Sequence, residues 1–584
     1  MAIIDGVVRL VYRNPALLGA IRRARLDQVG QRLRLTGTDS RPPKRWIAPP
    51  LKWVQLLARL GAVAGAVEPT VSAVQPVASA DERVGGAFEP RVKADSSARG
   101  HGILWAAANS HQNQQAAKRL LFRLVNRADL AAEPDKLWLL ATAVAARFPA
   151  PETMAQLIRI TRFGTAAELC PALLALMDSP DTAGRLDLPL QLVAKPIVEA
   201  DSTGRLTVHT GIHRVAREVI TRWLAKHDIA IAMWDRHRSI FRTPTATELD
   251  HIHGDIPETR FIRLRRDIAR IRFAKPCLLV PWHTSIVLTD LPKASAGLAL
   301  SALAQYSGSE VVAIGYDLIP IASAELRPPE NTAATLAGLV PLKRAKRIAA
   351  ISNSAAREFA GFSSMLAAQG LTGPEVRAVP LPTEVAPLQF APLTEATVTR
   401  PTNHRPIILL TGSREPHKNQ RALLHAAETL WADGLDFELR LAGGKGWRDD
   451  ALPTIERLKA KGYPIVDLGR VSEAQLWEEL QTADAVAFAS LHEGYGLPVA
   501  EALSAGTPVL TSDYGSQAEI AAGGGVLMAD PRDDQALADG MRRLITEPDL
   551  RAKLREAAVQ RPKTTWDDYA NRLWEVLIEG NDGN

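Results

Sequence analysis

Cysteine is nearly missing from this 584-residue chain, which has only Cys170 and Cys277. Two cysteines so far apart in sequence exclude a disulfide framework and a cysteine-based zinc cluster, and they suit a reducing compartment. The chain also has no run near the roughly 20 uncharged apolar residues that a membrane-spanning helix needs. Its first residues lack the basic start, long apolar run and small-residue cleavage site of a signal peptide. We therefore expect a cytoplasmic location.

Patterns that would hold a metal ion or a nucleoside triphosphate are weak. The stretch DHIHGD at residues 250–255 has two histidines and flanking aspartates, but a metal site there would need strand-like geometry and a further ligand. The stretch GGKG at residues 443–446 lacks the full Gly-x4-Gly-Lys-Ser/Thr spacing of a phosphate-binding loop. We expect neither a bound metal nor a tightly bound cofactor.

What the chain does contain is ordinary globular material. Hydrophobic residues make up 46% of it and charged residues 23%, which is enough apolar material for large cores. Since one domain usually takes about 100–200 residues, we expect several domains.

Residues 1–67 combine an excess of basic residues with apolar ones. Seven arginines interleave with Val, Leu and Ile: Arg9, Arg13, Arg22, Arg23, Arg25, Arg32 and Arg34. Residues 51–67 then form an apolar, helix-like segment with Trp53 near its start. Two interpretations stay open: the region docks on an anionic membrane surface, at the inner face of the membrane, or it packs on the protein itself. Nucleic acid is not expected as a partner, because aromatic residues, which stack on bases, make up only 5% of the chain.

Periodicity divides the rest of the chain. Residues 68–100 are rich in Pro, Ala, Ser and Gly, which is typical of a disordered linker, and residues 101–190 have a helical pattern. Beyond them, short apolar runs alternate with amphipathic helices, which indicates parallel sheets covered by helices on both faces. A polar connector interrupts the alternation, so we predict two α/β domains of Rossmann-like type at residues 191–390 and 391–565. In such sheets ligands bind at the carboxyl ends of the strands.

Charged and glycine-rich turns follow three of the strands predicted in the second domain. They read TGSREPHKN after PIILL, AGGKGW after FELRL, and SLHEGYGLP after AVAFA. In the first turn, Arg414 offers a planar fork for phosphate oxygens and Lys418 a mobile point charge. The last turn leads into a helix whose free N–H groups form an anion site, and Pro498 suits its first turn. The chemistry indicates a diphosphate site.

Two carboxylates, Glu493 and Glu501, lie on either side of this last turn. Two carboxylates beside phosphates would repel them unless they bind hydroxyl groups instead, and the second lies about two helical turns beyond the first. The glycines let the backbone approach a ligand closely. We therefore predict that the acids bind sugar and ribose hydroxyls, while the glycines and the helix start bind the phosphates.

These turns resemble the donor-binding half of the retaining glycosyltransferases of family 4, also called glycosyl transferases group 1. The likeness covers residues 405–580, and paired glutamates around a Gly-aromatic-Gly-Leu-Pro turn are its most distinctive part. It implies the GT-B fold, in which two Rossmann-like domains face each other, and a closing helix in residues 566–584 that packs back across the domain gap. Residues 1–190 have no counterpart in it. The resemblance implies catalytic roles for Glu493, Arg414 and Lys418, and donor-binding roles for Gly211, Gly412, Arg414, Lys418, Gly494, Tyr495, Gly496, Leu497 and Glu501.

The first domain is less similar to the family. The stretch HTGIHRVAREV, which contains Gly211, is similar to the family's first glycine-containing loop and the helix after it. Many members have a histidine directly after the strand that here reads VVAIG, whereas this chain has Tyr316 followed by Asp317. We therefore take Asp317 as a catalytic candidate, together with His283, which stands at another predicted strand end.

The resemblance implies that the chain moves a sugar from a nucleotide-diphosphate sugar, such as GDP-mannose, to a glycan or lipid-linked acceptor in surface polysaccharide or cell-envelope glycan synthesis. No Asp-x-Asp pair occurs, the motif with which the other main glycosyltransferase fold binds diphosphate through a metal. Cationic side chains and the helix start would then stabilise the leaving diphosphate. Two alternatives stay open: a nucleotide-sugar epimerase or phosphorylase of the same fold, and a non-catalytic scaffold that senses nucleotide sugar.

Overall fold

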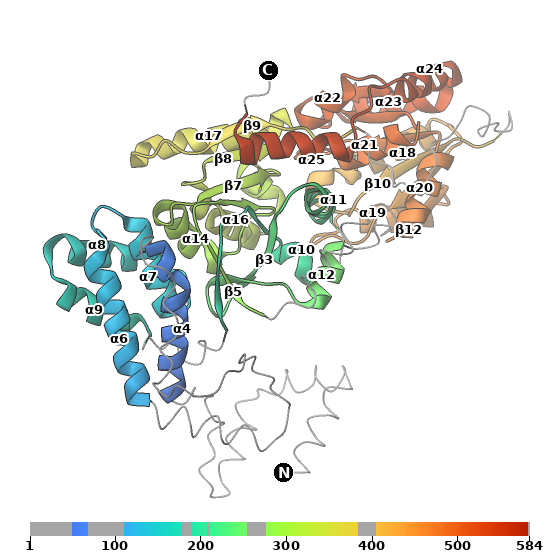
Figure 1. Ribbon diagram of the computed structural model, residues 1–584. Helices are drawn as coiled ribbons and strands as arrows, with labels where there is room; N and C mark the ends of the chain where they lie inside the picture. Colours follow the sequence, from blue (N-terminus) through green and yellow to red (C-terminus); the bar gives the residue numbers. More distant parts are fainter. Residues whose placement is uncertain are drawn as a thin grey trace, which may run out of the picture.

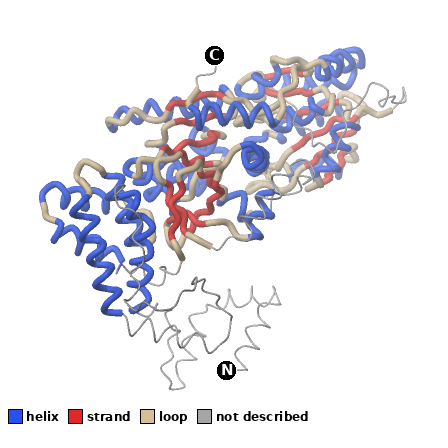
Figure 2. The backbone as a smooth tube through the Cα atoms, in the orientation of Figure 1, coloured by secondary structure: helices blue, strands red, loops and turns tan. Residues whose placement is uncertain are grey.

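The computed structural model describes residues 49–67, 110–177, 188–206, 210–253, 276–383 and 404–581. The basic residues 1–48, the proposed linker at 68–100 and most of the connector between the α/β domains lie outside these ranges. A layer of helices, a first sheet and a second sheet follow one another through the molecule (Figure 1). The strands gather in two groups with helices around them (Figure 2). Within the described ranges, no helix is both long and apolar enough to cross a membrane.

The helical layer contains the segment that we grouped with the basic N-terminal region. Apolar side chains on one face of α4 (Pro49–Val67), among them Leu56, Leu60 and Val63, are fully buried against the neighbouring helices. This face is therefore covered by protein and is not available to a membrane, and α4 belongs with the helical segment. The other helices of the layer are α6 (Ser110–Arg127), α7 (Pro134–Ala145), α8 (Pro151–Phe163) and α9 (Ala166–Met177).

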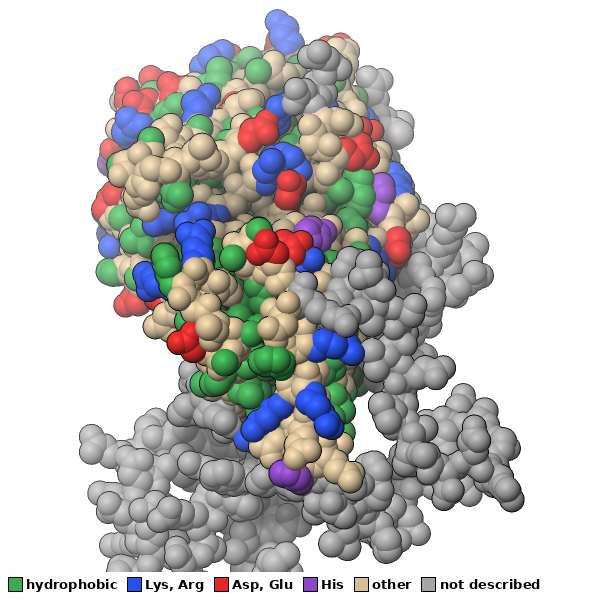
Figure 3. Space-filling view, turned by 60° about the vertical axis from the view of Figure 1, so that its left-hand side comes forward, with side chains coloured by type: hydrophobic (Ala, Val, Ile, Leu, Met, Phe, Trp, Pro, Cys, Tyr) green, Lys and Arg blue, Asp and Glu red, His purple; other side chains and the backbone are tan. Residues whose placement is uncertain are grey.

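A basic surface remains on the outside of this layer. Figure 3 is turned so that the layer comes forward, and it shows basic and hydrophobic side chains together over its lower part. On α6, Lys118 and Arg119 are exposed, and Phe122 keeps 51% of its surface accessible.

The first sheet has nine strands in the order β1-β5-β4-β3-β2-β6-β7-β8-β9. The neighbouring strands in the part β3-β2-β6-β7-β8-β9 are parallel. Strand β4 runs antiparallel to both of its neighbours, β3 and β5. The parallel part was predicted from the alternating pattern, and β4 was not. The strands are β1 (Leu190–Val193), β2 (Ile197–Glu199), β3 (Ala230–Asp235), β4 (Ile240–Arg242), β5 (Leu278–Pro281), β6 (Ser285–Leu288), β7 (Glu310–Gly315), β8 (Arg347–Ala350) and β9 (Glu375–Ala378). Helices α10 (Asp201–Arg205), α11 (Gly211–Lys226), α12 (Ala246–His253), α14 (Ala294–Tyr306), α15 (Ile319–Ala322), α16 (Pro329–Leu342) and α17 (Asn353–Met365) connect them.

The second sheet is entirely parallel, with the order β12-β11-β10-β13-β14-β15. In chain order this is the Rossmann arrangement 3-2-1-4-5-6, and the direction of winding reverses between β10 and β13, where such sheets bind ligands. The predicted pair of Rossmann-like domains, the GT-B fold, is confirmed. The strands are β10 (Ile407–Thr411), β11 (Glu438–Ala442), β12 (Ile465–Gly469), β13 (Ala485–Phe488), β14 (Val509–Ser512) and β15 (Val526–Ala529). The helices are α18 (Gln420–Ala432), α19 (Leu452–Ala460), α20 (Glu473–Thr482), α21 (Leu497–Ser504), α22 (Gly515–Ala521), α23 (Asp534–Thr546) and α24 (Pro548–Val559).

After the second sheet the chain returns to the first domain. The indole N–H of Trp223 in α11 donates to the Ala570 carbonyl of α25 (Trp566–Trp574) at 2.8 Å, and the rings of Trp223 and Trp574 lie 5.2 Å apart. Arg347 of β8 donates to the Leu577 carbonyl at 2.9 Å. The C-terminal segment therefore fastens the two domains together.

An aromatic cluster fuses the helical layer to the first sheet. Phe148, which follows α7, is fully buried and packs on Trp138 of α7 as well as on Trp234 and Phe241 of β3 and β4. Ring centroids in these pairs lie 5.3 to 6.0 Å apart. The layer and the sheet therefore share one core, and we expect them to unfold together.

The first prediction tests this shared core. Replacing Phe148 with alanine should lower the free energy of unfolding of this part by about 3–5 kcal/mol, because the substitution opens a cavity in a packed cluster. The matched control is Phe163→Ala, because Phe163 is 88% exposed and its loss should change stability by no more than about 0.5 kcal/mol. Urea unfolding followed by tryptophan fluorescence measures both. Equal stability of the two variants would show that the layer is held by other contacts.

Candidate active site

A buried ion pair lies at the point where the winding of the second sheet reverses. Lys418 ends the turn after β10, Glu493 lies in the loop after β13, and their Nζ and Oε1 atoms are 2.6 Å apart. Their side chains are only 15% and 10% exposed. Ser490 Oγ lies 2.8 Å from the same carboxylate oxygen, and the ammonium group sits 5.3 Å from the centre of the Phe488 ring. The two residues that we expected at the reacting sugar and the diphosphate are thus in direct contact.

Hydrogen bonds and close packing fix the loop that carries Glu493. The Ser516 hydroxyl donates to the Glu493 carbonyl at 2.8 Å, and the Tyr495 hydroxyl donates across the domain gap to the Leu381 carbonyl at 3.0 Å. A Cβ atom on Gly494 would lie 2.5 Å from the Tyr316 carbonyl, so this position must be glycine. Gly496 has a φ of 108° and caps α21, a conformation that glycine adopts without strain. The turn is built into a rigid contact with the first domain.

Two helix starts face each other across the gap. A Cβ atom on Gly211, the first residue of α11, would lie 2.8 Å from Cδ1 of Leu497, the first residue of α21. Helix N-termini carry partial positive charge and unpaired N–H groups, and each favours an anion. The predicted glycine loop of the first domain and the predicted turn of the second therefore meet.

Glu501 points to the same gap from inside α21. Its Oε1 atom accepts a hydrogen bond from Nη1 of Arg214 in α11 at 2.9 Å. Burial raises the pKa of the Glu501 carboxyl, and the Arg214 charge opposes that rise. This second glutamate therefore joins the domains in the structure as it stands, next to the helix starts.

Arg414 does not share the surroundings of Lys418. Its guanidinium is 5% exposed and binds Asp449 at 2.8 Å and Asp467 at 2.9 Å. Gly412, two residues before Arg414, has a φ of 97°. The ends of β10 and β11 approach each other closely here, because a Cβ atom on Gly443 would lie 1.8 Å from the Gly412 carbonyl oxygen. The structure thus gives the two cations different partners, and the predicted phosphate contact would require Arg414 to leave both carboxylates.

The first domain contributes Asp317 to the site. Burial and the charges of Glu358 and Glu493 raise the pKa of the Asp317 carboxyl to about 6. Its Oδ1 atom accepts from the Ile319 amide at 3.1 Å, and a Cβ on Gly494 would lie 3.2 Å from Oδ2. Asp317 therefore lies against the loop that carries Glu493.

Tyr316 stands where many members of the family have a histidine, but its side chain does not face the gap. It lies under α11. Its side chain is buried and its hydroxyl donates to the Thr289 carbonyl at 2.9 Å. Burial raises the pKa of Tyr316 well above its usual value, so the phenol stays neutral.

His283 lies at the wrong edge of the sheet for the catalytic role that we expected. It precedes β6 and contacts Gly308, which precedes β7, whereas Asp317 follows the carboxyl end of β7. Its Nε2 atom lies 3.0 Å from Asp135 of the helical layer, and its side chain is 53% exposed. The expectation of a catalytic role for His283 is therefore wrong. The sequence did not show that a bend between β5 and β6 places His283 before a strand as well as after one.

Sequence reasoning missed a histidine at the domain contact. His492 Nε2 lies 2.7 Å from Glu358 of α17, and Nδ1 lies 2.9 Å from the Ser323 hydroxyl. Burial alone would lower the pKa of His492, but the hydrogen bond and charge of Glu358 outweigh it and raise the pKa. Glu493, the next residue, could be predicted from the motif of its own loop. Glu358, the partner of His492, lies 134 residues away in the chain.

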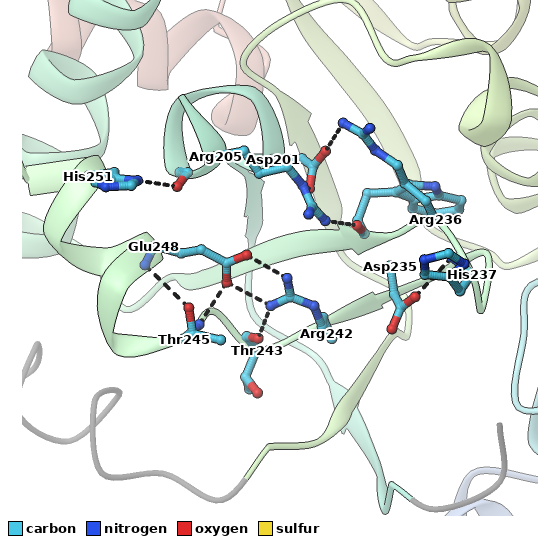
Figure 4. A network of polar contacts seen from close by, with 12 residues as sticks. Asp201, Arg205, Asp235, Arg236, His237, Arg242, Thr243, Thr245, Glu248 and His251 are labelled. Atoms are coloured by element: carbon cyan, nitrogen blue, oxygen red, sulfur yellow. Dashed lines mark hydrogen bonds and ion pairs between the residues drawn. The ribbon is translucent and has the colours of Figure 1, made fainter. Parts of the chain in front are cut away.

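Charged residues also support the strand ends of the first domain. Figure 4 shows Arg242 bound to both oxygens of Glu248, and Arg205 beside Asp201. Arg205 also donates to the Trp234 carbonyl at 2.8 Å. His251, from the DHIHGD stretch, contacts the carbonyl of residue 204 at 2.8 Å. Among the residues that the structure describes, no group of three or more His, Cys, Asp or Glu side chains is placed to hold a metal ion.

Glu199, at the end of β2, should be protonated at neutral pH. Burial, together with the charges of Asp201 and Asp290, raises the pKa of Glu199 from 4.5 to about 8. Between these two values the folded protein holds a proton that the unfolded chain has lost, so this group makes stability fall as the pH rises through that window.

The second prediction follows from this carboxyl. Glu199→Gln has no proton to lose, so its melting temperature should fall less between pH 5 and 8 than that of the wild type, a window set by the pKa values 4.5 and about 8. Differential scanning fluorimetry across this range measures the slope, and Glu325→Gln, an exposed acid, should keep the wild-type slope. Parallel slopes for wild type and Glu199→Gln would mean that Glu199 is ionised in the folded protein.

Part of the sequence is similar to a family of known proteins. Residues 395–561 match the family described as Glycosyl transferases group 1. O-antigen chain mannosyltransferase B of Escherichia coli is 38% identical over 131 residues, which are 22% of this chain and 34% of that protein. D-inositol 3-phosphate glycosyltransferase of Corynebacterium urealyticum is 32% identical over 178 residues, 29% of this chain and 42% of that protein. The chain thus spans less than half of the length of each of these two relatives.

Solved structures with similar folds are more distant in sequence. HepE of Anabaena, in complex with UDP and glucose, has a TM-score of 0.44 and 14% identity over 66% of this chain and 99% of its own. The lipopolysaccharide outer core galactosyltransferase WaaB has a TM-score of 0.40 and 16% identity over 65% and 98%. The fold assignment therefore rests on the strand order itself. In sequence, the second Rossmann-like domain, which carries Lys418, Glu493 and Glu501, is the part of the chain that matches the group 1 glycosyl transferases.

Proposed function

We propose that this protein is a retaining glycosyltransferase that moves a sugar from a nucleotide-diphosphate sugar to a hydroxyl group of a glycan or lipid-linked acceptor. One observation carries the proposal: the buried Lys418–Glu493 pair lies at the switch point of the second sheet. The starts of α11 and α21, which meet across the domain gap, support it. The match of residues 395–561 to the group 1 glycosyl transferases supports it.

In this proposal the diphosphate binds between the helix starts and Lys418. The ammonium group then turns from Glu493 to the phosphate oxygens, and the released carboxylate of Glu493 accepts hydrogen bonds from hydroxyls of the transferred sugar. Glu501, about two helical turns further along the chain inside α21, accepts from ribose hydroxyls after release from Arg214. Both glutamates thus meet hydroxyl donors, and Lys418 meets phosphate oxygens, so neither glutamate is left facing the phosphates.

The reaction breaks the bond between the anomeric carbon and the diphosphate oxygen, and its electron pair stays on the diphosphate. Lys418 and the N–H groups of α21 stabilise that charge as it develops. The acceptor oxygen forms the new bond on the same face, and its proton passes to Asp317. A carboxyl with a pKa of about 6 is ionised at neutral pH yet basic enough to take this proton. Cationic groups of the protein supply the charge stabilisation, so we propose that no metal is required.

For the sugar, we propose mannose delivered as GDP-mannose. Three relatives of Escherichia coli, each a serotype-specific mannosyltransferase WbdA, support this choice together with O-antigen chain mannosyltransferase B. The acceptor would then be a growing surface polysaccharide.

The experiment that tests this function is turnover of a panel of nucleotide sugars with and without EDTA. GDP-mannose should be consumed fastest, EDTA should leave the rate unchanged, and proton NMR should show that the product keeps the α configuration of the donor. Absence of turnover or hydrolysis with every donor would contradict the proposal. An inverted product would contradict the retaining mechanism alone.

The third prediction separates the two glutamates. Contacts to the reacting sugar strengthen as its anomeric carbon gains positive charge, whereas ribose contacts do not change during the reaction. Glu493→Gln should therefore mainly lower kcat, and Glu501→Gln should mainly raise the KM for the donor. Loss of one charged hydrogen bond, about 1.5–3 kcal/mol, corresponds to about a 10- to 150-fold effect. Steady-state kinetics with saturating acceptor decide the matter, and reversed patterns would show that the two assignments must be exchanged.

A further inference from the structure

A second ion pair joins the domains behind the two facing helix starts. Arg214 is the fourth residue of α11 and Glu501 the fifth residue of α21, and Nη1 of the arginine lies 2.9 Å from Oε1 of the glutamate. Residues three or four apart share one face of a helix, so both side chains lie on the faces that bring Gly211 and Leu497 together. The pair therefore lies beside the place that the proposed function gives to the diphosphate.

The side chain of Arg214 is long enough to reach the start of α11. Side chains on an α-helix lean toward its N-terminus, and one helical turn is about 5.4 Å long. Arg214 lies three residues after Gly211, the first residue of the helix, which is less than one turn. Rotation about the bonds of its own side chain can therefore bring the guanidinium to an anion at the helix start, and the helix does not have to move.

The arginine that the sequence predicts for the phosphates is held by other groups. Arg414 binds Asp449 at 2.8 Å and Asp467 at 2.9 Å, and neither aspartate is assigned to the donor, so donor binding does not compete for them. Arg214 differs, because its partner Glu501 is the carboxylate that the proposed function assigns to ribose. Ribose hydroxyls that bind Glu501 therefore favour the release of Arg214.

The charges at the gap favour a second cation on the diphosphate. Without Arg214, the carboxylates of Glu493 and Glu501 and two ionised phosphate groups would share the charge of Lys418 and the partial charges of the helix starts. Unpaired charges in a site that is mostly closed to water are costly, and the Arg214 and Glu501 side chains are only 21% and 16% exposed. A guanidinium presents a planar fork of N–H donors that matches phosphate oxygens. Arg214 is therefore suited to bind the remaining negative charge.

We propose that Arg214 is a donor-binding residue of the first domain, which leaves Glu501 when ribose binds there and donates to the diphosphate instead. This inference rests on the proposed function, because that function places the ribose and the diphosphate. The structure holds two cation–carboxylate pairs at the gap, Lys418–Glu493 and Arg214–Glu501. A donor exchanges both pairs, since its hydroxyls take the carboxylates and its phosphates take the cations. The first domain thus supplies a full positive charge to the donor in addition to its helix start.

The fourth prediction is a calorimetric titration of GDP into the full chain. Arg214→Gln should raise the Kd of GDP about tenfold or more, because it removes a charged partner of the diphosphate. Arg214→Lys keeps a cation beside Glu501 and should give a smaller rise. The matched control is Arg327→Gln, because Arg327 and Glu415 form another ion pair between the domains, 3.0 Å apart, with side chains 23% and 19% exposed. The control should keep the wild-type Kd.

The same titration in a Glu501→Gln background separates a direct contact from an indirect one. If Arg214 acted only by holding Glu501 in place, Arg214→Gln would change nothing in that background. A direct contact with the diphosphate predicts a loss at least as large as in the wild type, because Arg214 no longer has to leave a carboxylate. Glu501→Gln also removes the ribose contact, so the effect of Arg214→Gln is compared within each background.

Three results would contradict the role of Arg214 alone. They are an equal Kd for the wild type and Arg214→Gln, an equal loss in Arg327→Gln, and no loss in the Glu501→Gln background. No binding of GDP by the wild type would contradict this role together with the choice of GDP-mannose as donor. Turnover of the nucleotide-sugar panel decides the proposed function separately, because a chain that transfers sugar and binds GDP without Arg214 would overturn only this inference.

Discussion

The contact between Lys418 and Glu493 is the constraint around which the gap between the domains is arranged. Removing two charges from water is costly, and only a close contact with further hydrogen bonds offsets the cost. The structure supplies both, because the pair is 2.6 Å apart and Ser490 lies 2.8 Å from the carboxylate. In the proposed function, the Lys418 ammonium is already in place to bind the diphosphate. When it leaves Glu493, the Glu493 carboxylate can accept hydrogen bonds from sugar hydroxyls.

Other contacts across the gap hold the loop of Glu493 against the first domain. The Glu519 carboxylate of α22 accepts from the first two amides of α17, at 2.8 Å from Asn353 and 2.6 Å from Ser354. The Ser352 hydroxyl donates to the Gly494 carbonyl at 2.6 Å. An acid at a helix N-terminus is a favourable contact, so these bonds stabilise the closed arrangement of the domains.

Much of this fold could be predicted from local patterns. The parallel strands of the second domain alternate with helices at regular spacing, and the glycine-rich turns mark their carboxyl ends, so topology alone brings Lys418 and Glu493 together. Gly211 and Leu497 were both predicted to bind the donor, from the family resemblance, and their close approach across the gap was first seen in the structure. These features depend on residues close in sequence to a strand end.

What could not be predicted depends on partners far away in the chain. Nothing near Arg414 shows that Asp467, on another strand, takes its guanidinium, and nothing near His283 shows that it lies beside Asp135. The apolar face of α4 was compatible with a membrane until α6 and α7 were seen to cover it. For His283 and α4 these contacts rule out the predicted role, whereas for Arg414 they add two carboxylate partners that the sequence did not show.

Nucleoside diphosphate binding tests the central role of the Lys418–Glu493 pair most directly. Calorimetric titration of GDP compares three proteins. In the wild type the Lys418 ammonium is paired with a carboxylate, in Glu493→Gln it is not, and in Lys418→Met it is absent. The account predicts weaker binding by Lys418→Met, and tighter binding by Glu493→Gln because Lys418 no longer has to leave a carboxylate. Equal affinity of all three proteins would contradict it, because the diphosphate would then bind without Lys418.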